Sequence, residues 1–476
     1  MQSGGPNAVA WLAAALVEDP IGRAWRVLLF LCALAGLLAA PALAADWPQL
    51  QNGPQRLGYS PETIEPPLKN AWAVGLSPER LHPQAQPVIS GGRLFIGTAM
   101  GNLHAFDAKT GQRRWQFAAG GPILHTAGAE GGRVFFGCLD GCVYALDAAD
   151  GKLAWKFDGG QRTGFSTAVL LAEGNVFIAN RGGTYYALSQ KNGAVAWKQD
   201  LGVPILMSSA FDAGKLFFGA MDMRVYALDS KTGRIAWKSE PLPGAAFKDY
   251  WPVAFKGYVL VRPARVSGGA TGPAIEWLCG PLPESELAKQ EAMIQAFEKN
   301  PASRNLFVLD AATGREAMLV PHWVTCTMNG ATPPPCVDGD GLLVIPVLLH
   351  DWRGGWGRLD LAKRRVVEVL CEDKADERGH RRGMGNSDEN LNVSASGRGV
   401  LVFHTEEGNA NFTGVWHLDR REWVQVAGYH VDGFFTSNTQ GGGGNPPAAA
   451  DGMIFHTSWN TLNGRTAMLA GKEGAP

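Results

Sequence analysis

The sequence lacks a strong imbalance of charge. Its 476 residues include 43 Lys and Arg and 44 Asp and Glu, which gives a formal net charge of −1 at pH 7. Nucleic acids and anionic membranes attract proteins mainly through an excess of basic side chains. The composition offers no electrostatic basis for either partner, and we expect that no nucleic acid is bound.

Short motifs for bound groups are also missing. None of the seven cysteines lies in a Cys-x-x-Cys-His sequence, which excludes a c-type haem attached through that motif. Four consecutive glycines at 441–444 do not stand between a strand and a helix. We interpret them as a loop and not as a phosphate-binding turn.

The N-terminal region has the order of an export signal. Arg23 and Arg26 precede an apolar run at residues 27–38, and Ala42-Leu43-Ala44 offers a small-x-small cleavage sequence. We predict a signal peptide at residues 1–44, a periplasmic or secreted protein, and no integral membrane domain after cleavage. An uncleaved N-terminal membrane anchor is the alternative. Cys32 lies inside the apolar run, which argues against a lipid-anchor cysteine.

One motif recurs along the chain: an Asp, then Gly four positions later and Trp eight positions later. Its residues are Asp107, Gly111, Trp115, Asp147, Gly151, Trp155, Gly193, Trp197, Asp229, Gly233, Trp237, Asp310 and Gly314, with Ser189 replacing the third Asp and Met318 the fifth Trp. The four tryptophans are spaced by 40, 42 and 40 positions. A fixed period near 40 with strand-forming content is typical of a propeller or a solenoid.

The physical chemistry of one copy explains the motif. Residues 133–136 and 143–146 are short strand-forming runs joined by a tight turn. Asp147 can hydrogen-bond the backbone of the next turn, and Gly151 supplies the positive φ that such a turn needs. Trp155 then falls on the outermost strand, where its apolar surface can contact the neighbouring unit. One sheet cannot bury both of its faces, so the units must stack.

We predict an all-β fold, an eight-bladed β-propeller with four-stranded antiparallel blades over residues 68–470, after an irregular lead-in at 45–67. Blades are expected at 83–118, 123–158, 163–200 and 205–240, then from 250 with an interruption, and at 336–370, 391–426 and 447–469. The last run is one strand short, and residues 68–76 can supply that strand. Strands from both termini would then close the ring and leave no exposed edge. Seven blades are the alternative.

The fifth unit contains an insertion at residues 263–304. Within it, residues 284–299 predict a helix, because Leu287, Ile294 and Phe297 fall on one stripe after Pro283. The insertion replaces a loop beside an innermost strand, so we expect it to rise near the central channel as a lid or packing helix.

Six cysteines follow the predicted signal peptide. An even number in an exported protein favours disulfides. Cys138 and Cys142 flank a three-residue hairpin loop, and we predict a bridge between them. The pairing of the others stays open; they are Cys279, Cys326, Cys336 and Cys371.

Polar residues gather in loops that a propeller places on one face. The loop before each innermost strand shares this face with the loop between the second and third strands. The residues are His82, His125, Lys248, Asp249, Asn329, Asp388, Glu389, Asn390 and Asn438. A central binding site is expected there, and we take Lys248, Asp249 and 388–390 as candidates.

Two histidines occupy matching places in the last two units. His404 and His456 both lie in Phe-His-Thr sequences where a second strand ends. They are candidates to point at one spot beside Asp388 or Glu389, as metal ligands or bases. The alternative is that each imidazole hydrogen-bonds a loop backbone.

The Asp–Gly–Trp repeat resembles the tryptophan-docking repeats of the quinoprotein β-propellers. This family includes pyrroloquinoline-quinone (PQQ) dehydrogenases, and the non-enzymatic lipoprotein of the outer-membrane β-barrel assembly machinery is similar. The sequence Asp46-Trp47-Pro48-Gln49 is also similar to the start of many secreted proteins with these repeats. The resemblance implies PQQ, Ca²⁺ held by Glu, Asn and Asp, a catalytic Asp and commonly a disulfide between adjacent cysteines if the protein is a dehydrogenase. Adjacent cysteines are missing, and 388–390 offers suitable ligand types without a matching motif.

Three functions remain from the sequence. The first is an exported, non-catalytic propeller, a monomer that binds a protein, peptide or glycan through its loop face, with no cofactor firmly implied. The second is a PQQ- and Ca²⁺-dependent dehydrogenase of alcohols or sugars. The third is a metal-dependent hydrolase or lyase that uses His404 and His456. The first is our main hypothesis.

Overall fold

The computed structural model describes residues 46–66, 68–160, 164–264, 277–322, 333–348, 354–371, 393–402, 414–425, 446–457 and 461–467. The chain divides into two units, Met1–Ala45 and Asp46–Pro476, and all described residues belong to the second. Within the described ranges, no helix is both long and apolar enough to cross a membrane.

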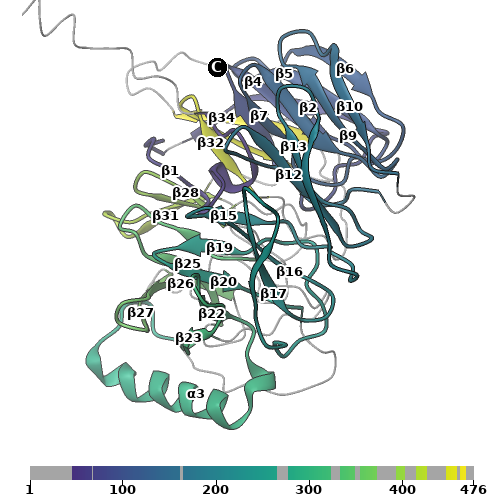
Figure 1. Cartoon of the computed structure of the whole chain (residues 1–476). Coiled ribbons are helices and arrows are strands. Elements are labelled where there is room, and N and C mark those ends of the chain that lie inside the picture. Colours follow the sequence, from purple (N-terminus) through teal and green to yellow (C-terminus); the bar gives the residue numbers. More distant parts are fainter. Residues whose placement is uncertain are drawn as a thin grey trace, which may run out of the picture. The chain divides into compact units, whose positions relative to one another are not determined.

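The described residues form an all-β fold of mainly antiparallel sheets, most of them four-stranded, as the repeat predicts (Figure 1). The first four sheets follow the repeat copies one by one. Their strands are β3 (Val88–Ser90), β4 (Arg93–Gly97), β5 (Asn102–Asp107), β6 (Arg113–Ala118); β7 (Gly128–Glu130), β8 (Arg133–Gly137), β9 (Cys142–Asp147), β10 (Leu153–Asp158); β11 (Leu170–Ala172), β12 (Asn175–Ala179), β13 (Thr184–Ser189), β14 (Val195–Asp200); β15 (Ala210–Asp212), β16 (Lys215–Gly219), β17 (Val225–Asp229), β18 (Ile235–Lys238).

Four further sheets complete the described part, and some take strands from distant segments. The fifth is β19 (Val253–Phe255), β20 (Tyr258–Val261), β22 (Phe307–Asp310), β23 (Glu316–Met318). The sixth is β24 (Cys336–Val337), β25 (Leu343–Leu348), β26 (Gly354–Asp360), β27 (Arg365–Leu370), with β21 (Gly280–Pro281) at its outer edge. The seventh is β28 (Val393–Ser396), β29 (Gly399–Val402), β30 (Gly414–His417), β31 (Glu422–Gln425), with β1 (Tyr59–Ser60) at its inner edge. The eighth is β32 (Ala448–Ala450), β33 (Met453–Thr457), β34 (Thr461–Ala467), with β2 (Leu68–Gly75) paired to β34.

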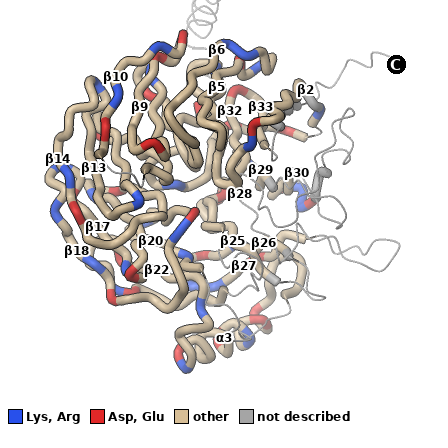
Figure 2. The backbone as a smooth tube through the Cα atoms, turned by 90° about the vertical axis from the view of Figure 1, so that its right-hand side faces the viewer, with Lys and Arg blue, Asp and Glu red and all other residues tan. Residues whose placement is uncertain are grey.

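The first strands of neighbouring sheets lie side by side around a common centre. Contacts join β3 to β7, β7 to β11, β11 to β15, β15 to β19, β24 to β28, β28 to β32, and β32 back to β3. Lys256, after β19, also reaches the carbonyl of Gly341 in the sixth sheet, 3.0 Å away. Figure 2 shows the sheets following one another around this centre.

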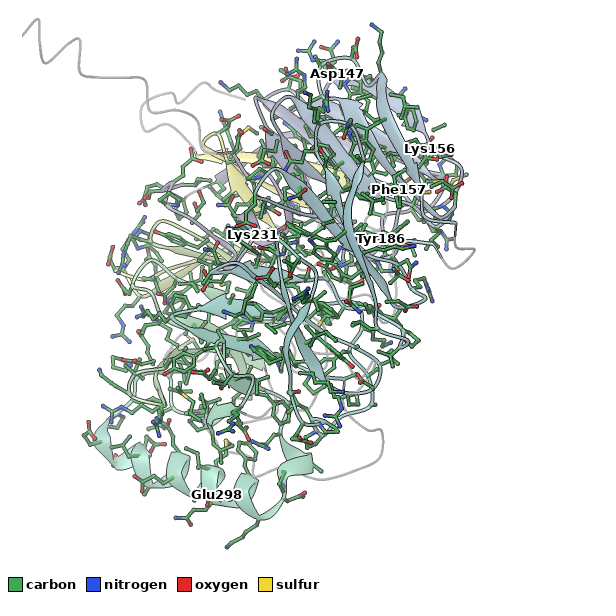
Figure 3. The ribbon with its side chains drawn as sticks, viewed as in Figure 1. Asp147, Lys156, Phe157, Tyr186, Lys231 and Glu298 are labelled. Atoms are coloured by element: carbon green, nitrogen blue, oxygen red, sulfur yellow. A yellow bond between two sulfur atoms is a disulfide. The ribbon has the colours of Figure 1, made fainter. Side chains whose placement is uncertain are left out.

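Apolar side chains fill the space between neighbouring sheets. Phe135 of β8 contacts Trp155 of its own sheet and packs in one cluster with Val169 and Ile178 of the third sheet. Figure 3 shows Phe157 of β10 beside Tyr186 of β13, and their rings meet edge to face at 5.3 Å. Each sheet therefore needs a neighbour on both faces to bury its side chains.

The repeat tryptophans join one sheet to the next. The Trp115 indole donates a hydrogen bond to the Ala148 carbonyl at 3.2 Å, and its ring lies against Gly151. The same pair of contacts recurs around the unit, for Trp155 with Gln190 and Gly193, Trp197 with Ser230 and Gly233, Trp237 with Ala311 and Gly314, and Trp72 with Ala108 and Gly111.

The insertion lies at the outer edge of the sixth sheet. Its β21 pairs with β27, the fourth strand of that sheet, and Cys279 is disulfide-bonded to Cys371 just after β27. Its helices are η2 (Glu284–Glu286), α3 (Leu287–Lys299) and η3 (Pro301–Ser303). The expectation that the insertion rises near the central channel is therefore wrong for its described residues 277–304.

A glutamine explains why α3 stays at this outer edge. The Gln290 side chain donates to the Val366 carbonyl at 3.0 Å and accepts from the Val366 N–H at 2.9 Å, as a paired strand would. Met293 and Phe297 are buried beneath the helix. The insertion covers a strand edge that would otherwise offer unpaired backbone groups.

The predicted bridge between Cys138 and Cys142 is wrong, because both are free thiols. The two residues form a hydrogen-bonded pair, with the Cys138 N–H donating to the Cys142 carbonyl at 3.0 Å. Such pairs keep opposed Cβ atoms about 5 Å apart, whereas a disulfide needs roughly 3.8 Å. The Cys138 thiol donates instead to the Gly121 carbonyl at 3.0 Å.

The irregular lead-in runs across the first strands of the sheets. It contains η1 (Leu50–Asn52), and Trp47, Leu50 and Arg56 have no exposed surface. Asp46 caps the turn after β3, accepting from the Ser90 hydroxyl and the Gly91 N–H. The lead-in thus begins at the ends of the first strands and not at the loops that lead into them.

Candidate functional site

The loops that lead into the first strands, here called inlet loops, lie beside the loops between second and third strands. The Ile123 N–H, before β7, donates to the Thr98 carbonyl, after β4, at 3.0 Å. Phe165 and Cys138 repeat this bond one sheet further on. Both kinds of loop therefore share one face, which we call the loop face.

Three inlet loops meet at the hydroxyl of Ser208. It lies 3.1 Å from Nε2 of His125 and accepts a hydrogen bond from the Ala168 N–H at 2.9 Å. The Ser208 N–H in turn donates to the Tyr250 carbonyl at 2.8 Å. These bonds link the inlet loops of the second to fifth sheets through buried polar groups, because Ser208 and His125 are at most 5 % exposed.

Lys248 and Asp249 are held at this face by the backbone. Residue 248 forms a parallel bridge with Leu206, and the Asp249 N–H donates to the Leu206 carbonyl at 3.1 Å. Asp249 has a φ of +66°, a conformation that non-glycine residues rarely adopt and that loops at functional sites often retain. The two side chains form an ion pair at 3.4 Å and are each about 40 % exposed.

The pKa values of His82 and His125, on this face, lie below the ordinary value. The pKa of His125 is lowered to about 3, mainly by burial and also by the nearby His82 and Arg56. Burial also lowers the pKa of His82, against the opposing effect of the Asp249 carboxylate. His82, His125 and Asp249 therefore lie within electrostatic reach of one another, although they come from three different inlet loops.

The structure brings together part of the polar set expected from the sequence. His82, His125, Lys248 and Asp249 are neighbours on the loop face. His404, Asp388, Glu389, Asn390, Asn329 and Asn438 lie outside the described residues.

His456 lies on β33, opposite Asn463, and is 6 % exposed. It has the register position that Ile96, Phe136 and Ile178 hold on the second strands of other sheets. Those residues pack between sheets, so His456 takes a packing position in the eighth sheet.

Sequence reasoning missed Ser208 and Arg56. Ser208 lies 83 residues after His125, or about two repeat periods, so aligning the inlet loops of successive units would have placed it near His125. Arg56 lies in the lead-in, which has no repeat to align, and no sequence signal marks it.

The PQQ–Ca²⁺ site that the resemblance implies for a dehydrogenase cannot be placed on the described residues. Within the described ranges, no group of three or more His, Cys, Asp or Glu side chains is placed to hold a metal ion. The possible ligands at 388–390 lie outside those ranges. We derive no reaction step through PQQ or Ca²⁺.

Comparison with known proteins identifies the repeat. The family model for the outer membrane protein assembly factor BamB matches residues 68–172 and 139–249. No curated protein matches the sequence.

Three solved structures are similar to this chain. BamB from Moraxella catarrhalis has a TM-score of 0.53 at 15 % identity, over 84 % of this chain and 99 % of its own. Quinohemoprotein alcohol dehydrogenase from Comamonas testosteroni has a TM-score of 0.57 at 14 % identity, over 90 % and 82 %. A europium-containing methanol dehydrogenase has a TM-score of 0.59 at 11 % identity, over 89 % and 98 %. The chain resembles both BamB and the quinoprotein dehydrogenases, and at these identities the likeness concerns the fold.

Proposed function

We propose that this chain is an exported, eight-bladed β-propeller that binds a partner through its loop face and catalyses no reaction there. The eight sheets, the contacts between their first strands and the pairing of β2 with β34 support a closed ring of eight blades. The signal-like residues 1–44 support a periplasmic or secreted location.

The observation that carries the binding role is the state of the polar groups on the loop face. His125 is buried, uncharged and hydrogen-bonded to Ser208, so it is a poor base for any substrate. The half-exposed charges of Lys248 and Asp249 form a pair that a polar partner can contact. This arrangement suits recognition of a protein, peptide or glycan. The match to the BamB model favours a protein.

Capture of partners by the immobilised mature chain tests this proposal. The double substitution Lys248→Ala, Asp249→Ala should weaken capture roughly fivefold or more, since the pair lies at the expected contact surface. A matched control is Asp150→Ala, Lys152→Ala, which removes an exposed ion pair from a turn remote from the inlet loops. Equal capture by both double variants would contradict a partner site at the loop face.

Titration of the mature chain with PQQ and Ca²⁺ tests the alternative, a quinoprotein dehydrogenase. We expect no saturable change in absorbance and no rise in melting temperature. Saturable binding with a raised melting temperature would instead support the dehydrogenase. Variants at Asp388, Glu389 and Asn390 would then locate the Ca²⁺ ligands.

A further inference from the structure

The lead-in contacts the first strands of seven sheets in the order of the sheets, and then the turn after the first strand of the eighth. In each of the seven, the N–H of one residue donates to the lead-in. The pairs are Ile89 to the Trp47 carbonyl, Ala129 to Pro48, Leu171 to the Gln49 side chain, Phe211 to Pro54, Ala254 to Gln55, Val337 to Leu57 and Ala395 to Gly58, all at 2.7–3.0 Å. In the eighth sheet, the Gly452 N–H after β32 donates to the Glu62 carboxylate at 2.6 Å.

The seven donors on first strands belong to strand edges that no other strand covers. Each first strand pairs with a second strand on one side only, apart from β28, which also pairs with β1 of the lead-in itself. An uncovered edge is the usual place where an extended peptide adds to a sheet through its backbone. Residues 46–62 use mainly backbone carbonyls as acceptors, which is the same mode of recognition.

A few side chains fix the register of this segment. Arg56 has no exposed surface and donates to the carbonyls of Leu50, Val169 and Ser209 at 2.9–3.1 Å. Burial lowers its pKa to about 9, so it remains mainly charged at neutral pH. Gln49 binds both backbone groups of Leu171, and Trp47 is buried against β3. Arg56 thus ties the segment to the third and fourth sheets at once.

We propose that the inner edges of the eight sheets form a peptide-binding site, and that residues 46–62 are its tethered ligand. The site recognises an extended peptide by its carbonyl groups and by three anchors, Trp47, Gln49 and Arg56. A separate peptide with this sequence fills the site when the tether is cut. Arg56 makes this site border the inlet loops, but the proposal does not depend on the partner proposed at the loop face.

The test cuts the tether in the folded, full mature chain. A protease site is inserted between Glu65 and Pro66, where the Glu65 side chain is 52 % exposed. After cleavage, the N-terminal fragment should stay bound during gel filtration, and a fluorescent synthetic peptide of residues 46–65 should exchange into the site saturably. Departure of the fragment without loss of melting temperature would overturn the proposal.

Two peptide variants distinguish sequence-specific binding from non-specific binding. Arg56→Ala should bind about tenfold more weakly or worse, because three carbonyls lose a charged donor. Thr63→Ser changes an exposed side chain just beyond residues 46–62 and should bind like the parent peptide. Equal binding of all three peptides would show that the Arg56 side chain does not contribute to recognition of the peptide.

If the cut chain unfolds when the fragment leaves, recovery of the fold becomes the measurement. Excess parent peptide should restore the circular dichroism of the sheets, and the Arg56→Ala peptide should fail to do so at the same concentration. Failure of the parent peptide to restore the fold would overturn the proposal. Partner capture through Lys248 and Asp249 is measured separately on the uncut chain.

Discussion

At Gly151 a hydrogen atom occupies the place that any side chain would need. Its φ is +73°, and a Cβ atom there would lie 2.7 Å from the ring of Trp115. That ring belongs to the preceding sheet, so one glycine serves both the turn and the contact between two sheets. The Asp–Gly–Trp spacing is therefore required both for the turn within one repeat unit and for the packing of one unit against the next.

Substituting this glycine should separate its two roles. Gly151→Ala meets both the unfavourable φ and the Trp115 ring, whereas Gly132→Ala, at φ +75° in the same sheet, has nothing within 4 Å of the new Cβ. We expect Gly132→Ala to lower the free energy of unfolding by about 1–2 kcal/mol. Gly151→Ala should cost about 1–3 kcal/mol more, because the indole must move. Denaturant unfolding of both variants measures the difference, and equal losses would show that the Trp115 contact contributes little.

The low pKa of His125 makes stability depend on pH. Its pKa is about 3 in the folded protein against 6.5 ordinarily, and the charged or titratable groups near it are His82, Arg56 and Asp249. Between these pH values the unfolded chain binds a proton that the folded chain does not, so stability falls as the pH drops from about 6.5 towards 3. Each pH unit contributes up to about 1.4 kcal/mol.

His125→Gln should remove this contribution while keeping a polar side chain near Ser208. The expected result is a flatter curve of unfolding free energy against pH between about 6.5 and 4, measured by urea titration at each pH. A variant curve parallel to that of the unsubstituted protein would mean that His125 already takes up a proton in the folded state.

Strand pairing shows how the sixth sheet replaces the tryptophan. In sheets one to four, an Ala on the third strand lies opposite the Trp of the fourth strand, next to a bulge. In the sixth sheet this position pairs Arg358 with Glu368. The Glu368 carboxylate lies 2.7 Å from Arg358 and 3.0 Å from Arg421 of the seventh sheet. An ion pair thus joins the sixth and seventh sheets where an indole joins the earlier ones.

The contact between the sixth and seventh sheets should be an acid-sensitive part of the fold. Hydrogen bonds from Arg398 lower the pKa of Asp340 and of Asp419 below 3.8. Their contribution is present above pH 3.8 and is lost as the pH falls through the lowered values. Amide exchange in β26, β27 and β30 should therefore accelerate between about pH 5 and pH 2.5 more than exchange in β12 and β13, after correction for intrinsic rates. Equal acceleration in both regions would contradict this assignment.

Across the whole molecule, the parts that the sequence could predict are those that repeat. The turn, the bulge and the Trp contact each involve residues within a few tens of positions of one another. The residue types that they require therefore recur at a fixed spacing that can be read from the sequence. The all-β fold with four-stranded antiparallel sheets is confirmed, and the strands of the first four sheets lie within the expected ranges.

The parts that could not be predicted depend on contacts without a repeated signal. The insertion was placed from the loop that it interrupts, but its position is set by Gln290 at the edge of β27 and by the bond from Cys279 to Cys371. Of the candidate site, His82, His125, Lys248 and Asp249 were foreseen as one face. Ser208 was not, because only an alignment of the inlet loops of successive units places it near His125. Arg56 was not foreseen either, because it binds backbone carbonyl groups. Every residue has a backbone carbonyl, so no sequence pattern marks the partners of Arg56.

The path of residues 46–62 also sets an order in time. This segment is synthesised early, yet the hydrogen bond between the Gly452 N–H and the Glu62 carboxylate spans 390 positions. The other hydrogen-bond donors to the segment lie on first strands spread along the chain, so these bonds form only after those strands have been synthesised. Contacts so distant in sequence are among the last to form, since a long loop must close before they stabilise anything. The first part of the domain to be synthesised is thus the last to reach its folded position. Until it does, the inner strand edges remain open, and the nascent protein is most exposed to aggregation or to a chaperone.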